Sequence, residues 1–333
     1  MSRRLLLAVL AVGLAPGSAG AEAVGTSGAQ ILTIEQGARG LGMGGAFISV
    51  ADDSNALWWN PAGIAHAQYR EATLSHTAYL DNIATEYFGY IHPVAQLHGV
   101  LGFSLTYLSI PGIDGTDASG NPTGSLKANG YVGSISYGLS VSSNLTVGVT
   151  GKYFSQTLGP NSGSDFAVDL GAQYWNDNYG VAVVAQNLGP SFSIGGVSDP
   201  LPRDLRAGAF YKPRSFFLIS FDEEQPYNET AIAHLGGEWT VTQGIRLRAG
   251  FQQTPGIAGA GVTAGIGLAG VFGGNAKDGS ESDAFKPFWE RMSNQDFKSS
   301  LATGGYVVGL DYAFVSYGSS LNDVQRISLF ARF

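Results

Sequence analysis

The chain has 333 residues, of which 48 are glycine and 13% are charged, with 26 acidic residues against 18 basic ones and no cysteine. Soluble domains average roughly 7% glycine and roughly 25% charged residues, so the composition is unlike that of an ordinary soluble enzyme. The lack of cysteine excludes disulfides, thiol nucleophiles and thiolate metal sites, and the acidic balance argues against a nucleic-acid partner.

Residues 1–21 have the pattern of a cleaved signal peptide. Arg3 and Arg4 form a basic start, residues 5–15 are apolar, and residues 19–21 read Ala-Gly-Ala, which fits the small-x-small cleavage site. The apolar run is too short to cross a bilayer as a helix. We therefore expect export and a mature chain with 16 basic and 26 acidic residues, a net charge of −10.

Residues 22–68 contain the glycine-rich stretch GARGLGMGGAFISVADDSNALWWNPAGIA, which does not have the pattern of a strand. A dinucleotide-binding loop needs a strand before it and a helix after it within a βαβ unit, and neither pattern is present. Glycines allow close packing or positive φ, and the Asp, Asn and Pro residues favour turns. We expect a compact segment built on Gly40, Gly42, Gly44, Gly45, Asp52, Asp53, Trp58, Trp59, Asn60, Pro61, Ala62 and Gly63.

From residue 69 onward, segments of about ten residues alternate between apolar and polar or small side chains. In LTVGVTGKYF, which starts at Leu145, Val147 and Val149 share one face and Lys152 lies on the other. A Lys or Arg facing lipid at the midplane costs about 2–4 kcal/mol, so charges belong on the lumen face of a membrane barrel. A soluble β-sandwich alternates too, but its strands average about 5–6 residues.

Fourteen such segments predict an all-β, transmembrane antiparallel β-barrel of about 14 strands over residues 69–333, with residues 22–68 as a hatch, or plug, inside its lumen. The expected strands lie near 71–79, 85–93, 98–109, 127–140, 145–155, 165–175, 179–188, 204–212, 216–223, 229–240, 245–254, 262–272, 305–317 and 326–333.

The polar face of these strands supplies the candidate lumen residues. They either form a charged lining or pair across the lumen and anchor the hatch, and pairing is favoured because an unpaired charge in a tight interior is costly. The candidates are Lys152, Asp169, Gln173, Arg206, His234, Glu238, Arg246, Arg248, Asp311 and Arg326.

Connections alternate in length, with short turns after even-numbered strands and longer loops, such as 110–126 and 189–203, after odd-numbered ones. Outer-membrane barrels keep short turns in the periplasm, so the chain would end there, at the aromatic Phe333. Residues 273–304 break the rule as a long insertion. Phe285, Phe288, Trp289 and Met292 within it predict an amphipathic helix, either a surface helix on the rim or a periplasmic docking site.

No catalytic constellation is found. The five histidines do not pair at metal-ligand spacing, no Gly-x-Ser-x-Gly elbow occurs, and residues 114–121 collect oxygens without EF-hand spacing, which favours a turn-rich loop over a calcium site. We expect no catalytic residue, metal or cofactor, and hence no enzyme.

The stretch from Gly37 to Ala65 closely resembles the signature of the PorV/PorQ family of outer-membrane proteins. That family resembles in turn the FadL-like long-chain fatty-acid transporter barrels, whose hatch carries an Asn-Pro-Ala motif, here Asn60, Pro61 and Ala62. VGVTGKYF, LPRDLRAGAFY and LDYAFVSYGSSLNDVQRISLFARF match as well, whereas 273–304 departs from the family, which usually has a short turn there.

The resemblance implies a fourteen-stranded outer-membrane barrel with a hatch, surrounded by lipid and inserted by the barrel-assembly machinery. For FadL-like members it implies passive uptake of hydrophobic small molecules through the plugged lumen. The alternative, implied for PorV members, is a component of type IX secretion that binds or shuttles secreted proteins.

Overall fold

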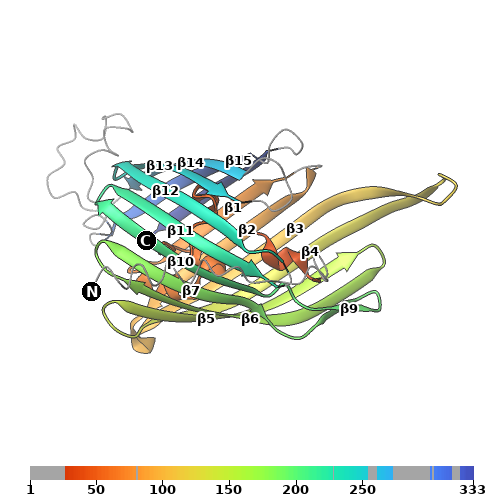
Figure 1. Ribbon diagram of the computed structural model, residues 1–333, viewed down its shortest axis with the longest axis horizontal. Coiled ribbons are helices and arrows are strands. Elements are labelled where there is room, and N and C mark those ends of the chain that lie inside the picture. Colours follow the sequence, from red (N-terminus) through yellow and green to blue (C-terminus); the bar gives the residue numbers. More distant parts are fainter. Residues whose placement is uncertain are drawn as a thin grey trace.

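The computed structural model describes residues 27–79, 82–227, 229–253, 261–272, 301, 304–316 and 323–333. Within this part of the chain, fourteen antiparallel strands form a closed barrel (Figure 1), in which β1 (Glu71–Ala78) pairs with β16 (Val324–Arg332) to complete the ring. The predicted barrel is confirmed. Closure leaves no sheet edge, so backbone polar groups are paired within the protein, as a lipid environment requires.

Each of the fourteen predicted strands overlaps one strand of the barrel. The remaining barrel strands are β2 (Ala84–Val94), β3 (Gly99–Thr116), β4 (Pro122–Ser140), β5 (Leu145–Leu158), β6 (Asn161–Trp175), β7 (Tyr179–Leu188), β10 (Asp204–Arg214), β11 (Phe217–Pro226), β12 (Ile232–Thr242), β13 (Ile245–Gln252), β14 (Gly261–Phe272) and β15 (Tyr306–Ser316).

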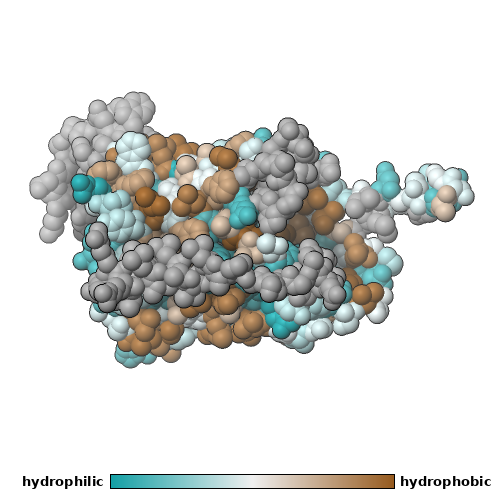
Figure 2. Space-filling view, in the orientation of Figure 1, coloured by the Kyte–Doolittle hydropathy of each residue, from teal (hydrophilic) through white to brown (hydrophobic). Residues whose placement is uncertain are grey.

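The two faces of the wall differ as the alternating pattern requires. On β6, Phe166 and Leu170 are 64% and 49% exposed, whereas Asp169 between them is fully buried. Figure 2 shows hydrophobic side chains spread over the outer wall of the barrel on the face in view. The outer face of the wall is therefore apolar, and the charged residues face the lumen, where they lie among buried apolar clusters.

The prediction of a long loop at 110–126 is wrong, because β3 and β4 continue through most of it as a hairpin. The pairing resumes after a register shift at Ile110/Ile113, with Asp114 opposite Ser125 and the connection at residues 117–121. The hairpin projects well beyond the other strands (Figure 1). Gly and Asp in this stretch indicated turns, but Pro111 sits at the bulge, where a strand tolerates it.

The other predicted long connection, 189–203, carries a two-stranded sheet of β8 (Phe192–Ile194) and β9 (Val197–Asp199). The predicted signal peptide (1–21) and the predicted amphipathic helix (285–292) lie outside the described residues. No helix in the described ranges is long and apolar enough to cross a membrane.

Residues 27–67, which we call the inner segment, contain four short helices. The wall donates hydrogen bonds to its backbone carbonyls from strands far apart around the ring. Gln186 on β7 bonds the carbonyl of Trp58, Ser220 on β11 that of Ala46, and Thr263 on β14 that of Gly42. A buried segment that reaches strands on several sides of a closed barrel lies in its lumen. The helices are η1 (Gln30–Thr33), α2 (Ala38–Gly42), α3 (Ala56–Trp59) and η2 (Pro61–His66).

Candidate functional site

The Asn-Pro-Ala motif shapes the turn between two helices of the inner segment. Asn60 Oδ1 accepts a hydrogen bond from the backbone N–H of Ala62 at 3.1 Å and so caps η2, with Pro61 at its first position. Asn60 Nδ2 donates to the carbonyl of Ile48, also at 3.1 Å. Nearby, Trp59 Nε1 donates to the carbonyl of Gln36 at 2.7 Å. The motif therefore joins three stretches of the inner segment.

The motif packs against a row of three glycines on adjacent strands of the barrel wall. These glycines were not predicted as site residues. Gly138 on β4 is opposite Gly148 on β5, which is opposite Gly171 on β6. A Cβ at these positions would collide with Ile64, Pro61 and Asn60, respectively. The row is a shallow groove that lets two backbones touch. Its signal in the sequence is a set of glycines at matching register on adjacent strands.

The GLGMGG stretch packs against the opposite side of the wall. Gly44 has φ +67°, a left-handed conformation that favours glycine, and a Cβ there would lie 2.5 Å from the backbone nitrogen of Phe251. Gly236 and Gly250, paired on β12 and β13, contact Met43 and Gly44. The glycines of this stretch therefore allow close packing of backbone against backbone.

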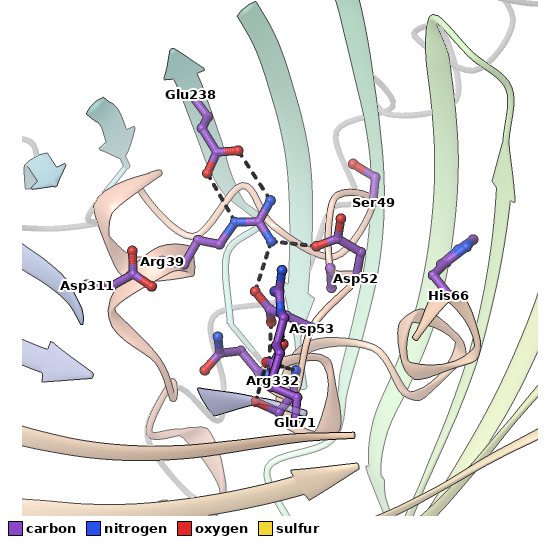
Figure 3. A network of polar contacts seen from close by, with 12 residues as sticks. Arg39, Ser49, Asp52, Asp53, His66, Glu71, Glu238, Asp311 and Arg332 are labelled. Carbon is purple, nitrogen blue, oxygen red and sulfur yellow. Dashed lines mark hydrogen bonds and ion pairs between the residues drawn. The ribbon is translucent and has the colours of Figure 1, made fainter. Parts of the chain in front are cut away.

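Arg39, in α2, is the centre of a buried ion-pair cluster (Figure 3). Its guanidinium donates to Asp53 at 2.8 Å within the inner segment and to Glu238 on β12 at 3.1 Å. It also donates to Asp52 at 2.5 Å. Glu238 accepts in turn from Arg248, which pairs with Asp311 at 2.5 Å. One chain of alternating charges therefore runs from the inner segment into β12, β13 and β15.

A second anchor involves Glu71, the first residue of β1. Its carboxylate accepts hydrogen bonds from the backbone N–H of Ser54 at 2.8 Å and the Ser54 hydroxyl at 2.7 Å, and it pairs with Arg332 on β16. Glu71 and Arg332 were not predicted as site residues. They lie at a strand end, where alternation gives no signal of a partner in the inner segment.

The pKa values of the two aspartates beside Arg39 are shifted in opposite directions by their surroundings. Burial raises the pKa of Asp53, and the neighbouring Arg39 only partly opposes it. Burial also acts on Asp52, but the Arg39 guanidinium outweighs it and holds the pKa of Asp52 below its usual range. Asp52 is the more solvated of the two, with 37% of its side chain exposed, which favours its charged form.

Arg206 on β10 is the centre of a second cluster, on the other side of the inner segment. It pairs with Asp204 at 2.5 Å and Glu224 at 2.9 Å, and lies 3.7 Å from Glu35 of the inner segment. His234 joins the cluster, with Nε2 at 3.0 Å from Glu224 and Nδ1 at 2.8 Å from the carbonyl of Gly44. Glu224, Asp204 and Glu35 extend the predicted set.

Four further predicted lumen residues have partners of different kinds, and Arg246 lines a cavity beside the inner segment. Lys152 pairs with Asp169 at 2.6 Å and donates to Asn187 at 2.9 Å. Gln173 donates to the carbonyl of Ile48 at 2.8 Å, and Arg326 donates to Thr77 at 2.6 Å. Phe333 instead lies half-exposed at the rim, where its backbone pairs with that of Arg70.

Two cavities flank the inner segment. The mouth cavity, about 130 Å³, lies at the end with the longer connections and is lined by residues that include Leu32, Trp58, Asn187, Pro202, Asp204 and Arg206. The rear cavity, about 170 Å³, lies at the end with the short turns and is lined by residues that include Arg39, Asp52, Trp175, Phe210, Lys212 and Arg246. Both have the size of a cavity of about 150 Å³ that holds benzene.

Comparison with known proteins identifies one family and one fold. A family model described as "Type IX secretion system protein PorV" matches residues 18–212, and no curated protein matches the chain. The toluene transporter TodX of Pseudomonas putida has a TM-score of 0.58 at 13% identity, covering 89% of this chain and 97% of its own. The toluene transporter TbuX of Ralstonia pickettii has a TM-score of 0.58 at 12% sequence identity, and the match covers 89% of this chain and 97% of TbuX. A Pseudomonas aeruginosa FadL homologue has a TM-score of 0.54 at 11% sequence identity, and the match covers 90% of this chain and 98% of the homologue. These likenesses show the fold.

Proposed function

Because the chain belongs to the family of the type IX secretion system protein PorV and has the fold of the FadL-type barrels, we propose that it passes small hydrophobic molecules across the outer membrane. In this proposal the inner segment acts as the hatch. Residues 1–21 direct export and are removed, and the barrel-assembly machinery inserts residues 69–333, whose aromatic end is Phe333.

The observation that carries the proposal is the position of the inner segment between two cavities. The mouth cavity and the rear cavity are each large enough for one ring-sized molecule, and the buried Trp58–Trp59 pair belongs to the segment between them. A molecule can pass from one to the other only when this segment shifts. A barrel that served only as a scaffold would not need a ligand-sized space on each side.

The mouth cavity also has the chemistry of a ligand site. Asp204 Oδ1 and Arg206 Nη1 are buried without a hydrogen-bond partner among the described residues, although Nη1 lies 3.7 Å from a carboxylate oxygen of Glu35, and both residues line the cavity beside Trp58. Such atoms favour a ligand that donates one hydrogen bond and accepts another. A ring with a hydroxyl group, such as a phenol, satisfies both atoms and leaves its apolar body against Trp58, Leu32 and Pro202.

The natural absence of cysteine permits a clean test. The hydroxyl oxygens of Ser54, in the inner segment, and Thr73, on β1, lie 2.5 Å apart, so Ser54→Cys with Thr73→Cys places a disulfide between segment and wall. In proteoliposomes we expect phenol flux to fall to the level of protein-free liposomes in the oxidised variant and to rise again after reduction. The matched control is Ser104→Cys with Ser134→Cys, a pair 2.6 Å apart within the wall.

Two results would contradict this function. One is flux of phenol that is equal in the oxidised and reduced Ser54/Thr73 variant. The other is a wild-type barrel that is no more permeable to phenol than protein-free liposomes. Replacement of Asn60-Pro61 by Ala-Ala provides an independent check, since it removes the η2 cap and should change the flux while the barrel still forms.

A second candidate function is a role in type IX secretion, favoured by the family match over residues 18–212. The projecting β3–β4 hairpin, with its connection at 117–121, extends the surface available to a secreted protein (Figure 1). Ser119→Cys at the exposed tip gives a cross-linking site. Cross-links to secreted proteins that share a C-terminal sorting domain would support this role, and their absence in a secreting cell would count against it.

A further inference from the structure

The rear cavity contains two basic side chains that form no ion pair with any carboxylate of the described residues. Among the described residues, no carboxylate lies within ion-pair distance of Lys212 on β10 or Arg246 on β13, although other lumen arginines such as Arg39, Arg206 and Arg248 are paired. Lys212 Nζ instead lies 5.4 Å from the ring centre of Trp175 and 4.9 Å from that of Phe210. Both cations line the cavity.

The acidic side chains of the same cavity are already engaged. Asp52 accepts from Arg39, and Glu238 accepts from both Arg39 and Arg248. Their hydrogen bonds therefore go to the clustered arginines; the charge of Glu238 also acts on Arg246, but the two residues form no ion pair. The donors left over are the guanidinium of Arg246 and the ammonium of Lys212, which attract an anion.

Aromatic side chains form another part of the lining, and two of them are held in place by contacts. Trp175 Nε1 donates to the carbonyl of Ser49 at 2.8 Å, and its ring stacks on His66 with centroids 4.0 Å apart and planes at 15°. The Phe210 ring meets Trp175 edge-on at 5.3 Å. These fixed rings give an apolar, aromatic surface next to the free cations.

We propose that the rear cavity binds a small organic anion: a carboxylate carried on a ring-sized apolar body. Arg246 holds the carboxylate through its forked N–H donors, Lys212 adds a second charge, and Trp175 and Phe210 contact the body. A volume of about 170 Å³ fits one ring. The site lies on the other side of the inner segment from the mouth cavity, and ligand binding there does not depend on transport.

The test is equilibrium binding to the purified full chain in detergent, by calorimetry, with benzoate as the probe and benzyl alcohol as its neutral counterpart. We expect benzoate to bind at least about tenfold more tightly than benzyl alcohol, since charge-assisted hydrogen bonds to the carboxylate separate the two. Arg246→Gln and Lys212→Gln should each weaken benzoate about tenfold and leave benzyl alcohol unchanged.

The matched control is Arg214→Gln, which removes an exposed cation from the same strand as Lys212 without touching the cavity. It should bind benzoate as the wild type does. Equal affinity of the wild type for benzoate and benzyl alcohol would overturn the proposal, and so would undiminished benzoate binding by folded Arg246→Gln and Lys212→Gln variants. The comparison of benzoate with benzyl alcohol on the wild-type protein tests the proposal even if a variant does not fold. Because no flux is measured, failure here is distinct from failure of the transport function.

Discussion

Arg39 Nε of the inner segment lies 3.1 Å from Glu238 Oε2 on β12, and the two residues are 8% and 7% exposed. This buried pair connects a segment near the start of the chain to a strand about two hundred residues later. Asp52 and Asp53 share the same guanidinium. The attachment is therefore electrostatic, and losing the single cation leaves three carboxylates without their shared partner.

Arg39→Gln should loosen the inner segment while the barrel still forms. Breaking a buried ion pair by removing one partner costs about 3–5 kcal/mol, because uncompensated charge stays behind. We expect chymotrypsin to cleave at Phe47 or Trp58 at lower urea than in the wild type. Loss of the folded barrel, detected by heat-modifiable migration in gels, would instead show that the cluster is needed for assembly.

The control for this variant is Arg203→Gln, which removes an exposed guanidinium 4.4 Å from the Tyr227 ring centre. Surface substitutions of this kind change stability by about 0.5 kcal/mol or less. An equal shift in Arg203→Gln and Arg39→Gln would mean that the buried cluster does not hold the segment.

Gly148→Ala should displace the inner segment, whereas Gly151→Ala on the same strand should not. A Cβ at Gly148 would collide with the carbonyl carbon of Pro61, while one at Gly151 meets nothing within 4 Å. We expect Gly148→Ala to lower the chymotrypsin threshold in urea and raise conductance in planar bilayers. Identical behaviour of the two variants would refute the role of the glycine row.

Acid should weaken the docking of the inner segment through His66. Burial lowers the pKa of this imidazole below its ordinary value of 6.5, with Lys212 adding to the effect and Asp52 and Gln173 opposing it. The released segment has the higher pKa, so His66 stabilises the docked state above pH 6.5, and this contribution is lost as the pH falls through the lowered pKa.

The measurement is the urea threshold for chymotrypsin cleavage between about pH 7.5 and about pH 5. His66→Gln cannot take up a proton and keeps a polar group near Gln173, so its threshold should depend less on pH than that of the wild type. A parallel pH dependence in the two proteins would assign the effect to other groups.

Leu170→Arg should impair insertion of the barrel. Leu170 lies in the middle of β6, 49% exposed, on the same face as Phe166. An arginine facing lipid near the midplane costs about 2–4 kcal/mol, falling to about 0–1 kcal/mol near the interface. The matched control is Leu158→Arg at the far end of β5. Refolding yield into liposomes should fall for the first variant only, and equal yields would argue against a lipid-facing wall at Leu170.

The barrel can be predicted from the order of the residues alone. Alternation with period two is a local property of the sequence. Because Lys152, Asp169 and Arg248 lie on the polar faces of their strands, the opposite faces are predicted to contact lipid. The strand count and the family followed from the same residues. The boundaries of β3 and β4 did not, because their pairing continues past Pro111 and through glycines that indicate a loop.

Which charged side chains contact one another follows from the folded arrangement and not from the residue pattern. The spacing of Arg39, Glu238 and Asp311 in the sequence does not indicate that they share one network. Closure of the barrel brings together residues that lie far apart in the chain, such as Arg39 and Glu238, which are 199 positions apart. The same holds for the glycine row at 138, 148 and 171, and for Lys212 and Arg246 in the rear cavity, which form no ion pair within the described part of the chain. Alternation fixes the face of a side chain, but its partner depends on strand register and on the path of the inner segment.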